Sequence, residues 1–377
     1  MSALQVVTLG CRLNHAESAR LAAELHGSRD TLLVNTCAVT AQAVRQSRRA
    51  VRQGRAQGLR VIATGCAATI DPAGFGALAD EVILNADKPE SAAPPLRHTR
   101  AFVPVQNGCD HACTFCIIPQ GRGPSRSRPV DEVVAEIEAL ADAGVAEVVL
   151  TGVDVTSYDA PDLGSLVVAI LRRVPALRRL RLSSLDGVEI DPLLFDLLAG
   201  EPRVMPHVHL SLQSGDDLIL KRMKRRHSRG DAVRLVERLK AARPGIAIGA
   251  DIIAGFPTES AAAHANNLSL IEQCAIVHGH VFPYSPRPGT PAARMPQVDP
   301  VLVRERAAEL RLAVARRRER WLSAKVGAVE PVLAEQDGTG HSPDFARYRL
   351  PDGILPGTVE MLRATALTDG LLQGEAV

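Results

Sequence analysis

The sequence contains no hydrophobic run long enough to cross a membrane, because no stretch approaches about eighteen consecutive apolar residues. Its N-terminus, MSALQVVTLG, lacks the basic segment and long apolar segment that mark a secretory signal. Aromatic residues make up only 3% of the chain, so composition gives no support for an aromatic platform that stacks single-stranded RNA. These absences favour a cytoplasmic protein that is not bound to a membrane.

Charge of one sign is not in excess either, since the formal net charge of the 377 residues is only +2. This balance alone neither supports nor opposes binding to nucleic acid. Two local runs are basic: KRMKRRHSR (residues 221–229) and RRRER (residues 316–320). Each run is either a solvated face or a site of phosphate contact.

The N-terminal part of the chain alternates between strand and helix patterns. Short apolar runs predict strands at residues 4–10, 31–36, 59–65 and 81–85, with helices at residues 14–27 and 41–54 between them. Because helices separate the strands, the sheet should be parallel. Residues 86–100, ADKPESAAPPLRHTR, are polar and rich in proline, which is typical of a linker.

The same alternation then repeats six times. Candidate strands lie at residues 102–105, 147–151, 179–183, 207–212, 246–253 and 277–282. Six such units predict an open, partial (β/α) barrel, in which ligands bind at the carboxyl ends of the strands. Gly, Pro and β-compatible residues after Trp321 predict a small β-barrel. We therefore expect an α/β protein with domains at residues 1–95, 100–320 and 321–377.

Cysteine is scarce, yet three of the seven cysteines directly follow the first three predicted strands. Cys11, Cys37 and Cys66 stand in TLGC, VNTC and ATGC. Parallel neighbours are about 4.8 Å apart, so loops after adjacent strands can bring three thiolates to one point. A shared metal or cluster site explains this placement, and the alternative is three separately buried small residues. Cys274, in LSLIEQCAIV, is most simply a core residue of a helix.

Three further cysteines lie within eight residues of GCDHACTFCIIPQGRG, at residues 108–123. Their spacings also suit one face of a helix, but Gly108, Pro119 and Gly121 leave room only for a very short one. Where disulfides are rare, grouped cysteines bind metal or do redox chemistry. Zinc prefers four ligands in paired C-x2-C spacing, and His111 as a fourth ligand would be strained. An iron–sulfur cluster on three cysteines leaves one iron open.

The stretch CDHACTFC, C-x3-C-x2-C with an aromatic residue before the last cysteine, resembles the signature of radical S-adenosylmethionine (SAM) enzymes. Together with TLGC, NTC and TGC, it makes the chain resemble the methylthiotransferases of that class from end to end. Further similar segments are RGPSRSRP, VLTGVDVTSY, HLSLQSG, LKRMKRR, DIIAGFPTE and FPYSPRPGTPAARM. The resemblance implies an N-terminal two-layer domain, a radical SAM partial barrel and a small C-terminal β-barrel of the RNA-binding TRAM type.

The resemblance also implies two [4Fe–4S] clusters, each held by three thiolates. The first would be held by the radical triad, which is Cys109, Cys113 and Cys116. Its open iron would chelate SAM, and an electron would split the cofactor into a radical that removes hydrogen from an unreactive C–H bond. The second would be held by the auxiliary triad, which is Cys11, Cys37 and Cys66. Its open iron would carry the sulfur that is methylated and inserted into the substrate.

Further contacts are implied for SAM and for RNA. Phe115 is expected near the adenine, and the other residues expected to line the SAM pocket are Thr151, Gly152, Gln213, Ser214, Asp251, Gly255 and Pro257. Ordinary turn chemistry at the strand ends is the alternative for these positions. Residues expected to steer RNA phosphates are Arg126, Arg128, Lys224, Arg225 and Arg226, with a solvated surface as the alternative.

Three branches of the family act on isopentenyladenosine in tRNA, on threonylcarbamoyladenosine in tRNA, or on an aspartate of a small-subunit ribosomal protein. TLGCRLN is similar to the threonylcarbamoyl branch, whereas the isopentenyl branch more often reads like FGCQMN and the ribosomal branch like LGCPKN. The resemblance thus implies methylthio insertion at C2 of N6-threonylcarbamoyladenosine, at position 37 of a tRNA anticodon stem-loop. Implied partners are an electron donor such as flavodoxin or ferredoxin and a sulfur donor, and we expect a monomer.

The C-terminal tail departs from this pattern. From Trp321 onward it has four Lys or Arg and eight Asp or Glu, whereas a barrel that grips tRNA should be basic. Phe345, Tyr348 and Arg349 could contact RNA locally, or the tail could mainly pack against the central barrel. An alternative from another class also remains, namely that the chain is a non-catalytic RNA-binding protein stabilised by structural metal.

Overall fold

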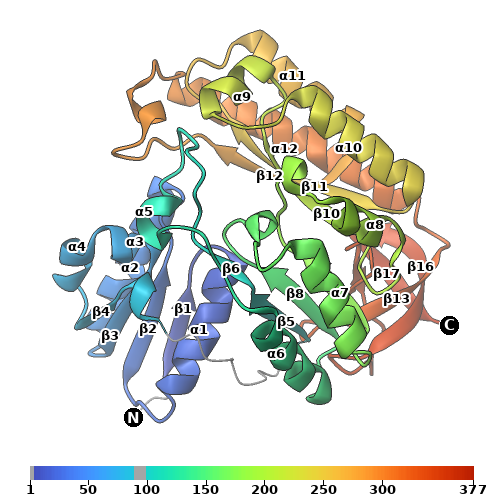
Figure 1. Cartoon of the computed structure of the whole chain (residues 1–377), viewed down its shortest axis with the longest axis horizontal. Helices are drawn as coiled ribbons and strands as arrows, with labels where there is room; N and C mark the ends of the chain where they lie inside the picture. Colours follow the sequence, from blue (N-terminus) through green and yellow to red (C-terminus); the bar gives the residue numbers. More distant parts are fainter. Residues whose placement is uncertain (1–3, 89–98) are drawn as a thin grey trace.

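The computed structural model describes residues 4–88 and 99–377 and shows three parts in chain order (Figure 1). A parallel sheet with helices comes first, a larger partial barrel follows, and a small closed barrel ends the chain. In the view of Figure 1 the first and last parts lie on opposite sides of the partial barrel. The predicted fold class is confirmed, while most of the predicted linker falls on residues 89–98, outside the described residues.

The N-terminal sheet has the order β1-β2-β3-β4, and all its pairs are parallel, as predicted. Its strands are β1 (Gln5–Thr8), β2 (Thr31–Thr36), β3 (Arg60–Gly65) and β4 (Glu81–Ile83). Its helices are α1 (Arg12–Glu24), α2 (Ala41–Ala56), α3 (Cys66–Ile70) and α4 (Pro72–Gly76), and η1 (Asn85–Asp87) follows. Every residue of β2 is buried, because a central parallel strand is covered on both faces. Neighbouring parallel strands place the residues that follow them at one edge of the sheet.

The partial barrel consists of two three-stranded parallel sheets. One contains β5 (Arg100–Pro104), β8 (Glu147–Thr151) and β9 (Arg179–Leu182). The other contains β10 (His207–Gln213), β11 (Ala247–Ala254) and β12 (Ile276–Pro283). Single bridges, Leu180 to Val204 and Leu185 to Leu210, join the sheets. All six strands predicted for this part are therefore confirmed, with ends that differ by at most two residues.

Helices cover the outside of these sheets: α6 (Val130–Asp142), α7 (Leu163–Arg173), α8 (Pro192–Gly200), α10 (Arg229–Ala242), α11 (Ala261–Gln273) and α12 (Pro300–Ser323). Shorter elements are β6 (Gln106–Asn107), α5 (Ile118–Arg122), β7 (Arg126–Ser127), η2 (Val155–Ser157), η3 (Gly187–Glu189), α9 (Asp217–Met223) and η4 (Pro291–Arg294). No helix among residues 4–88 and 99–377 is both long enough and apolar enough to span a bilayer.

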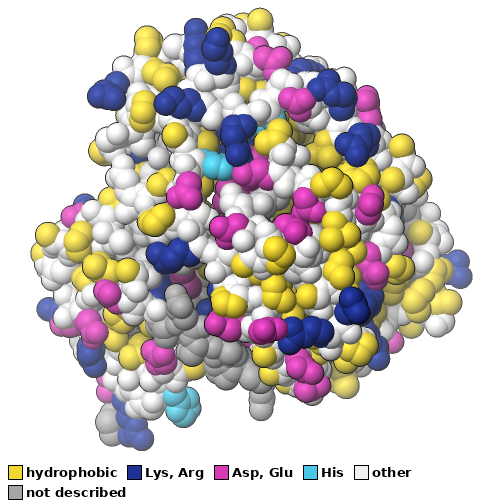
Figure 2. Space-filling model, in the orientation of Figure 1, with side chains coloured by type: hydrophobic (Ala, Val, Ile, Leu, Met, Phe, Trp, Pro, Cys, Tyr) yellow, Lys and Arg dark blue, Asp and Glu magenta, His cyan; other side chains and the backbone are white. Residues whose placement is uncertain are grey.

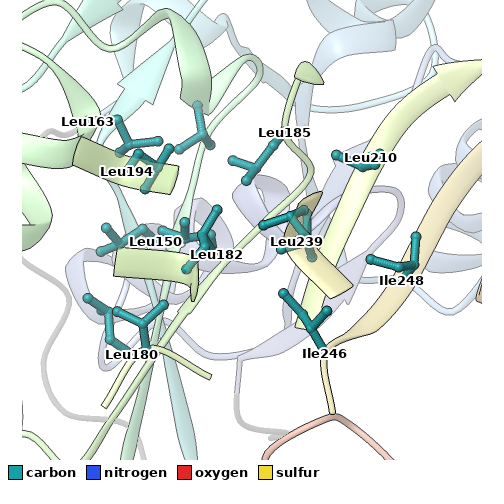
Figure 3. Close-up of a cluster of buried hydrophobic side chains, with 14 of the residues drawn as sticks. Leu150, Leu163, Leu180, Leu182, Leu185, Leu194, Leu210, Leu239, Ile246 and Ile248 are labelled. Carbon is teal, nitrogen blue, oxygen red and sulfur yellow. The ribbon is translucent and has the colours of Figure 1, made fainter. Parts of the chain in front are cut away.

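Alternate residues of the barrel strands face the helices and build the main core. Figure 3 shows Leu150, Leu180 and Leu182 of the first sheet near Leu163 and Leu194 of the outer helices. Burying each such side chain stabilises the fold by about 1.5–3 kcal/mol. Because strand side chains alternate between faces, the residues between these leucines point into the barrel.

The interior of the barrel is polar, unlike its outer face. Interior-facing residues include Arg100, Glu147, Arg179, Arg181, His207, His209, Asp251, His278 and His280. At the amino ends of the strands, Glu147 is fully buried and accepts hydrogen bonds from Arg179 (2.9 Å) and from two nitrogens of Arg181 (3.0 and 3.1 Å). Burial alone would raise the pKa of Glu147, but Arg181 and Arg179 outweigh it and lower the pKa to about 2.

The small C-terminal barrel is closed, with the order β13-β14-β15-β17-β16. Its strands are β13 (Val329–Ala334), β14 (Thr339–His341), β15 (Arg347–Arg349), β16 (Val359–Thr368) and β17 (Leu371–Ala376). Tyr348 is fully buried in its core and donates its hydroxyl to Glu330 at 2.7 Å, so the predicted RNA contact of Tyr348 is wrong. Arg349 is exposed.

The loop between β14 and β15 closes the base of the partial barrel, where its strands begin. Phe345 stacks on His207, with ring centroids 5.3 Å apart, and lies 4.6 Å from the guanidinium carbon of Arg181. Arg181 also donates to the carbonyl of Pro343 (3.1 Å), and Arg179 to that of His341 (3.2 Å). The Phe345 ring is thus held inside the protein instead of being offered to RNA. Packing against the central barrel, one of the two expectations for this acidic tail, is what the structure shows.

Replacing Glu147 with Gln should lower the free energy of unfolding by about 3–5 kcal/mol, because it leaves buried arginines without their shared carboxylate. The effect should be complete above the ordinary pKa of 4.5 and should vanish as pH falls towards about 2, where Glu147 itself is protonated. Urea unfolding at several pH values measures both. Glu138→Gln, on an exposed turn of α6, is the matched control. Equal stability of the two variants at pH 7 would contradict this account.

Candidate active site

The structure brings the three cysteines of the auxiliary triad together at one edge of the N-terminal sheet. Cys11 follows β1 and caps α1, Cys37 follows β2, and Cys66 begins α3 directly after β3. Gly10 adopts φ +97°, and a β-carbon there would lie 3.0 Å from the Cys37 sulfur, so this loop needs glycine. Burial raises the pKa of Cys37 to about 11, with smaller contributions from negative charge at Cys66 and Cys11.

A buried arginine, Arg122, lies against this triad. It donates from Nε to the Cys66 sulfur at 3.2 Å and from its terminal nitrogens to Glu17 and Asn14. Lys88 forms a second buried ion pair with Glu17. Burial alone would lower the pKa of Arg122, but Cys66 and Glu17 raise it above its ordinary value. Burial raises the pKa of Cys11, and the positive charge of Arg122 offsets part of this rise.

The radical triad lies in the loop between β6 and α5. No helix forms over residues 108–117, so the helical interpretation of this stretch is excluded. The Cys109 sulfur accepts from the backbone N–H of His111 (3.4 Å), and the Cys113 sulfur accepts from Arg225 (3.7 Å). Burial raises the pKa of Cys109 to about 11 and that of Cys116 to about 12.

The two triads lie close to each other across the junction of the first two parts. Negative charge at Cys66 contributes to the raised pKa of Cys116, after the charges of Cys113 and Cys109. At the same junction, a β-carbon on Gly121 would lie 3.2 Å from the carbonyl oxygen of Cys66. The missing side chain at Gly121 therefore lets the backbone of α5 pack closely against the auxiliary triad.

Further contacts fix this junction. Arg20 of α1 donates to both oxygens of Glu136 in α6 at 3.1 Å, and Arg128 donates to the same carboxylate at 2.7 Å. On the other side, the hydroxyl of Ser285 accepts from the backbone N–H of Ala41 at 3.0 Å. These buried and half-buried bonds hold the N-terminal part against the barrel.

The donor set fits iron–sulfur clusters better than zinc. All seven cysteines are free thiols, and N–H donors point at the sulfurs of Cys66, Cys109 and Cys113, as they do at cluster ligands. The Nε2 of His111 lies 3.3 Å from Asp154 and 3.4 Å from Glu189, so acidic partners already engage the candidate fourth ligand. Cys274 ends α11 and is fully buried in the main core, as predicted.

The structure places most of the residues expected around SAM at strand ends of the partial barrel. Thr151 ends β8, Gln213 ends β10, and Gly152, Ser214, Gly255 and Pro257 lie in the turns that follow. Phe115 lies in the loop of the radical triad and packs edge-on against Phe256 with ring centroids 6.4 Å apart. Asp251 lies inside β11 and not at its end. Its Oδ1 contacts His209 (3.1 Å) and His280 (3.2 Å), and the alternating HVH and HGH patterns of β10 and β12 were the signal for this cluster.

Two glycines among these positions have steric reasons of their own. A β-carbon on Gly152 would lie 2.7 Å from the carbonyl oxygen of Gln106, and one on Gly255 would lie 2.5 Å from Val303. Gly255 also has φ +70°. Close packing therefore explains both glycines without a ligand.

Carboxylates of the protein bind three of the five basic residues expected to steer phosphates. Arg126 and Lys224 are exposed. Arg226 is also exposed, but it forms ion pairs with Glu189 (2.5 Å) and Asp186 (3.5 Å). Arg128 is bound to Glu136, and Arg225 forms a buried ion pair with Asp186 at 3.0 Å. Figure 2 shows acidic side chains and a histidine gathered near the middle of this face, with basic groups around them.

Comparison with known proteins agrees with this geometry. A family model described as the radical SAM superfamily matches residues 103–268, and one described as uncharacterized protein family UPF0004 matches residues 3–84. The fold is also shared with the radical SAM methyltransferase TsrM from Kitasatospora setae with cobalamin and a [4Fe–4S] cluster bound. That likeness has a TM-score of 0.56 at 16% identity, and covers 78% of this chain and 77% of that chain. Fold and site define a radical SAM protein with a separate N-terminal cysteine domain.

The chain is 40% identical to a threonylcarbamoyladenosine tRNA methylthiotransferase MtaB of Rickettsia prowazekii (strain Madrid E), over 98% of this chain and 96% of the relative. It is 31% identical to a tRNA-2-methylthio-N(6)-dimethylallyladenosine synthase of Cereibacter sphaeroides (strain ATCC 17025 / ATH 2.4.3), over 99% of this chain and 98% of the relative. The chain therefore belongs to the radical SAM tRNA methylthiotransferases. SAM and [4Fe–4S] chemistry, with tRNA as substrate, follow from this membership.

Replacing Arg122 with Met should destabilise the cluster-free protein by about 3 kcal/mol, because it removes half of the buried charge that compensates Glu17. Arg60→Met is the matched control, since Arg60 pairs with Glu81 on the surface and its loss should cost less than about 1 kcal/mol. Urea unfolding of metal-free protein measures the difference independently of any cluster. An equal decrease in the free energy of unfolding in the two variants would show that Arg122 does not stabilise the fold more than a surface arginine does.

Proposed function

We propose that this protein inserts a methylthio group at C2 of N6-threonylcarbamoyladenosine at position 37 of tRNA. The observation that carries the proposal is the meeting of two three-cysteine groups at one domain junction, where α5, which follows the radical triad, packs against Cys66 through Gly121 and Arg122. The relatives with the matching printed activity supply the substrate. Two adjacent three-thiol sites suit a reaction in which a radical and a sulfur must meet at one base.

In this proposal, the radical triad and the auxiliary triad each hold one [4Fe–4S] cluster. When bound, the clusters and SAM supply the electron, the radical and the sulfur that the reaction requires. The protein's own part is to orient and to shield. Arg225 and Arg122 direct N–H groups at sulfurs of the two triads, which stabilises ligands that carry negative charge.

The strand-end residues serve the cofactor in the same proposal. Thr151, Gln213 and Ser214 form the rim of the SAM pocket beside the radical triad. The hydroxyl of Ser214 is held by Asn267 at 3.1 Å, so the rim is already ordered by hydrogen bonds within the protein. The exposed cations Arg126 and Lys224 attract the RNA backbone towards this rim, whereas Arg226 is already paired with Glu189.

The remaining assignments follow from this function. The domains are residues 1–95 for the auxiliary site, 100–320 for the radical SAM core and 321–377 for the TRAM-like barrel. Partners are a tRNA anticodon stem-loop, a one-electron donor such as flavodoxin or ferredoxin, and a sulfur donor. We predict a cytoplasmic monomer.

Iron analysis tests the number of clusters. Anaerobically reconstituted protein should contain about eight iron atoms per chain, and replacing either whole triad with alanine should leave about four. Cys274→Ala is the matched control and should keep about eight, because Cys274 lies in the main core away from both triads. Stoichiometric zinc in place of iron would instead favour the non-catalytic protein with structural metal.

Nucleoside mass spectrometry of total tRNA, with and without the gene, tests the substrate. Loss of the gene should abolish 2-methylthio-N6-threonylcarbamoyladenosine and let its precursor accumulate. Loss of the isopentenyl product would keep the chemistry and overturn the substrate. No change in either would lead to the ribosomal-protein aspartate and then to the non-catalytic alternative.

A further inference from the structure

Arg12 is a charged side chain in the barrel interior that no carboxylate of residues 4–88 and 99–377 binds. It is the first residue of α1, directly after Cys11, and its guanidinium carbon lies 5.8 Å from the centre of the Phe102 ring on β5. The charges of Arg100, Arg181, Glu147 and Asp251, which all face the interior, act on it. Arg12 therefore projects from the N-terminal part into the space enclosed by the strands.

The lack of a partner sets Arg12 apart from the arginines that are more deeply buried. Among the described residues, Arg12 has no hydrogen bond and no ion pair, whereas a carboxylate binds each of Arg20, Arg122, Arg179, Arg181, Arg225 and Arg306. Arg12 is half-buried. A desolvated guanidinium is costly unless an anion or polar group meets it, so an unpaired one facing an enclosed space indicates a site for an anion.

The nearest acidic side chains do not fill this role. Glu147 is committed to Arg179 and Arg181, and the Oδ1 of Asp251 is shared between His209 and His280. The contacts from the two imidazoles offset the negative charge of Asp251. An incoming carboxylate would therefore meet an uncompensated cation at Arg12.

The substrate of the proposed function carries such an anion in the required place. A threonylcarbamoyl group ends in a carboxylate and is attached through N6 to C6 of adenine, and C6 and the reacting C2 are separated only by ring nitrogen N1. The substituent and the reacting carbon thus lie on the same edge of the base. A residue that holds the carboxylate must lie beside the group that delivers sulfur to C2, and Arg12 is the residue after Cys11.

We propose that Arg12 binds the carboxylate of the threonylcarbamoyl group and thereby selects this substrate over adenosines with uncharged N6 substituents. The inference rests on the proposed function and adds its specificity-determining residue. A planar guanidinium suits a carboxylate because it donates two parallel hydrogen bonds. Phe102, on the other side of Arg12, keeps water away from the pair.

Arg287 is the other cation at this junction that could bind an anion of the RNA. Its side chain lies near Cys37, and its buried Nε has no hydrogen-bond partner in the part of the chain that the structure describes. Its neighbours Pro286 and Pro288 are exposed. An arginine on such an exposed loop suits a phosphate of the RNA backbone, which every tRNA offers equally. Arg12 and Arg287 therefore predict different selectivity.

The test compares the binding of anticodon stem-loop RNAs to reconstituted protein. One RNA carries threonylcarbamoyladenosine at position 37, and the second carries the same group with its carboxylate converted to a carboxamide. Dissociation constants are measured for wild type, Arg12→Gln, Arg12→Lys, Arg287→Gln and the surface control Arg172→Gln on α7. Combining each variant with both RNAs gives a cycle that isolates the coupling between arginine and carboxylate.

Wild type should prefer the acid over the amide, and Arg12→Gln should lose this preference by roughly tenfold to a hundredfold while binding the amide RNA as before. Arg12→Lys should keep part of the preference, and Arg172→Gln should keep all of it. Equal weakening of both RNAs by Arg12→Gln, or loss of the preference in Arg287→Gln instead, would overturn the inference.

Activity separates this failure from failure of the proposed function. If wild type methylthiolates the threonylcarbamoyl RNA and Arg12→Gln shows the same preference as wild type, only the role of Arg12 is wrong. If wild type instead modifies only an RNA that carries isopentenyladenosine, the proposed substrate is wrong and Arg12 has no carboxylate to bind. Unchanged iron content of Arg12→Gln shows that the auxiliary site is intact.

Discussion

The contact of Arg122 with the N-terminal part is the interaction on which the site depends. One buried guanidinium reaches Cys66, Glu17 and Asn14, so it joins the barrel to α3, which begins at Cys66, and to α1, which begins directly after Cys11. The position of one triad relative to the other is set by this bond network and by the bare backbone at Gly121. A reaction that needs two clusters at one base requires rigidity of this kind, because small displacements of reacting groups cost large factors in rate.

Much of this architecture could be predicted from the sequence. Apolar runs separated by helical periodicity gave six barrel strands with nearly correct ends, because strand burial leaves a strong local pattern. Cysteines at the ends of parallel strands could be grouped because strand spacing is fixed. The strand predicted at residues 246–253 already contained Asp251 and ended one residue before the observed end of β11. The contacts of Asp251 with His209 and His280 became visible only in the structure, because they join three different strands.

The pairings of charged residues could not be predicted. Two of the ion pairs, Arg122 with Glu17 and Arg20 with Glu136, join residues more than one hundred positions apart in the sequence. A local sequence pattern cannot predict contacts over such a separation. The same limit explains why Arg128 and Arg225 looked like phosphate ligands although carboxylates bind them. The same limit explains why the burial of the Phe345 ring was not predicted. The ring packs against His207 and Arg181, and these two residues come from different strands that are distant in sequence.

The insertion of the 341–346 loop into the barrel base means that the C-terminal part is not a detachable module. Arg179 and Arg181 satisfy donors on its carbonyl groups, and the His207 ring lies under Phe345. A chain cut before β13 would expose buried guanidinium and imidazole groups to water at the bottom of the catalytic barrel. Loss of activity in such a truncated chain would therefore report a damaged barrel as readily as a missing RNA contact. Point substitutions on the outer face of the small barrel can separate its contact with RNA from its support of the partial barrel.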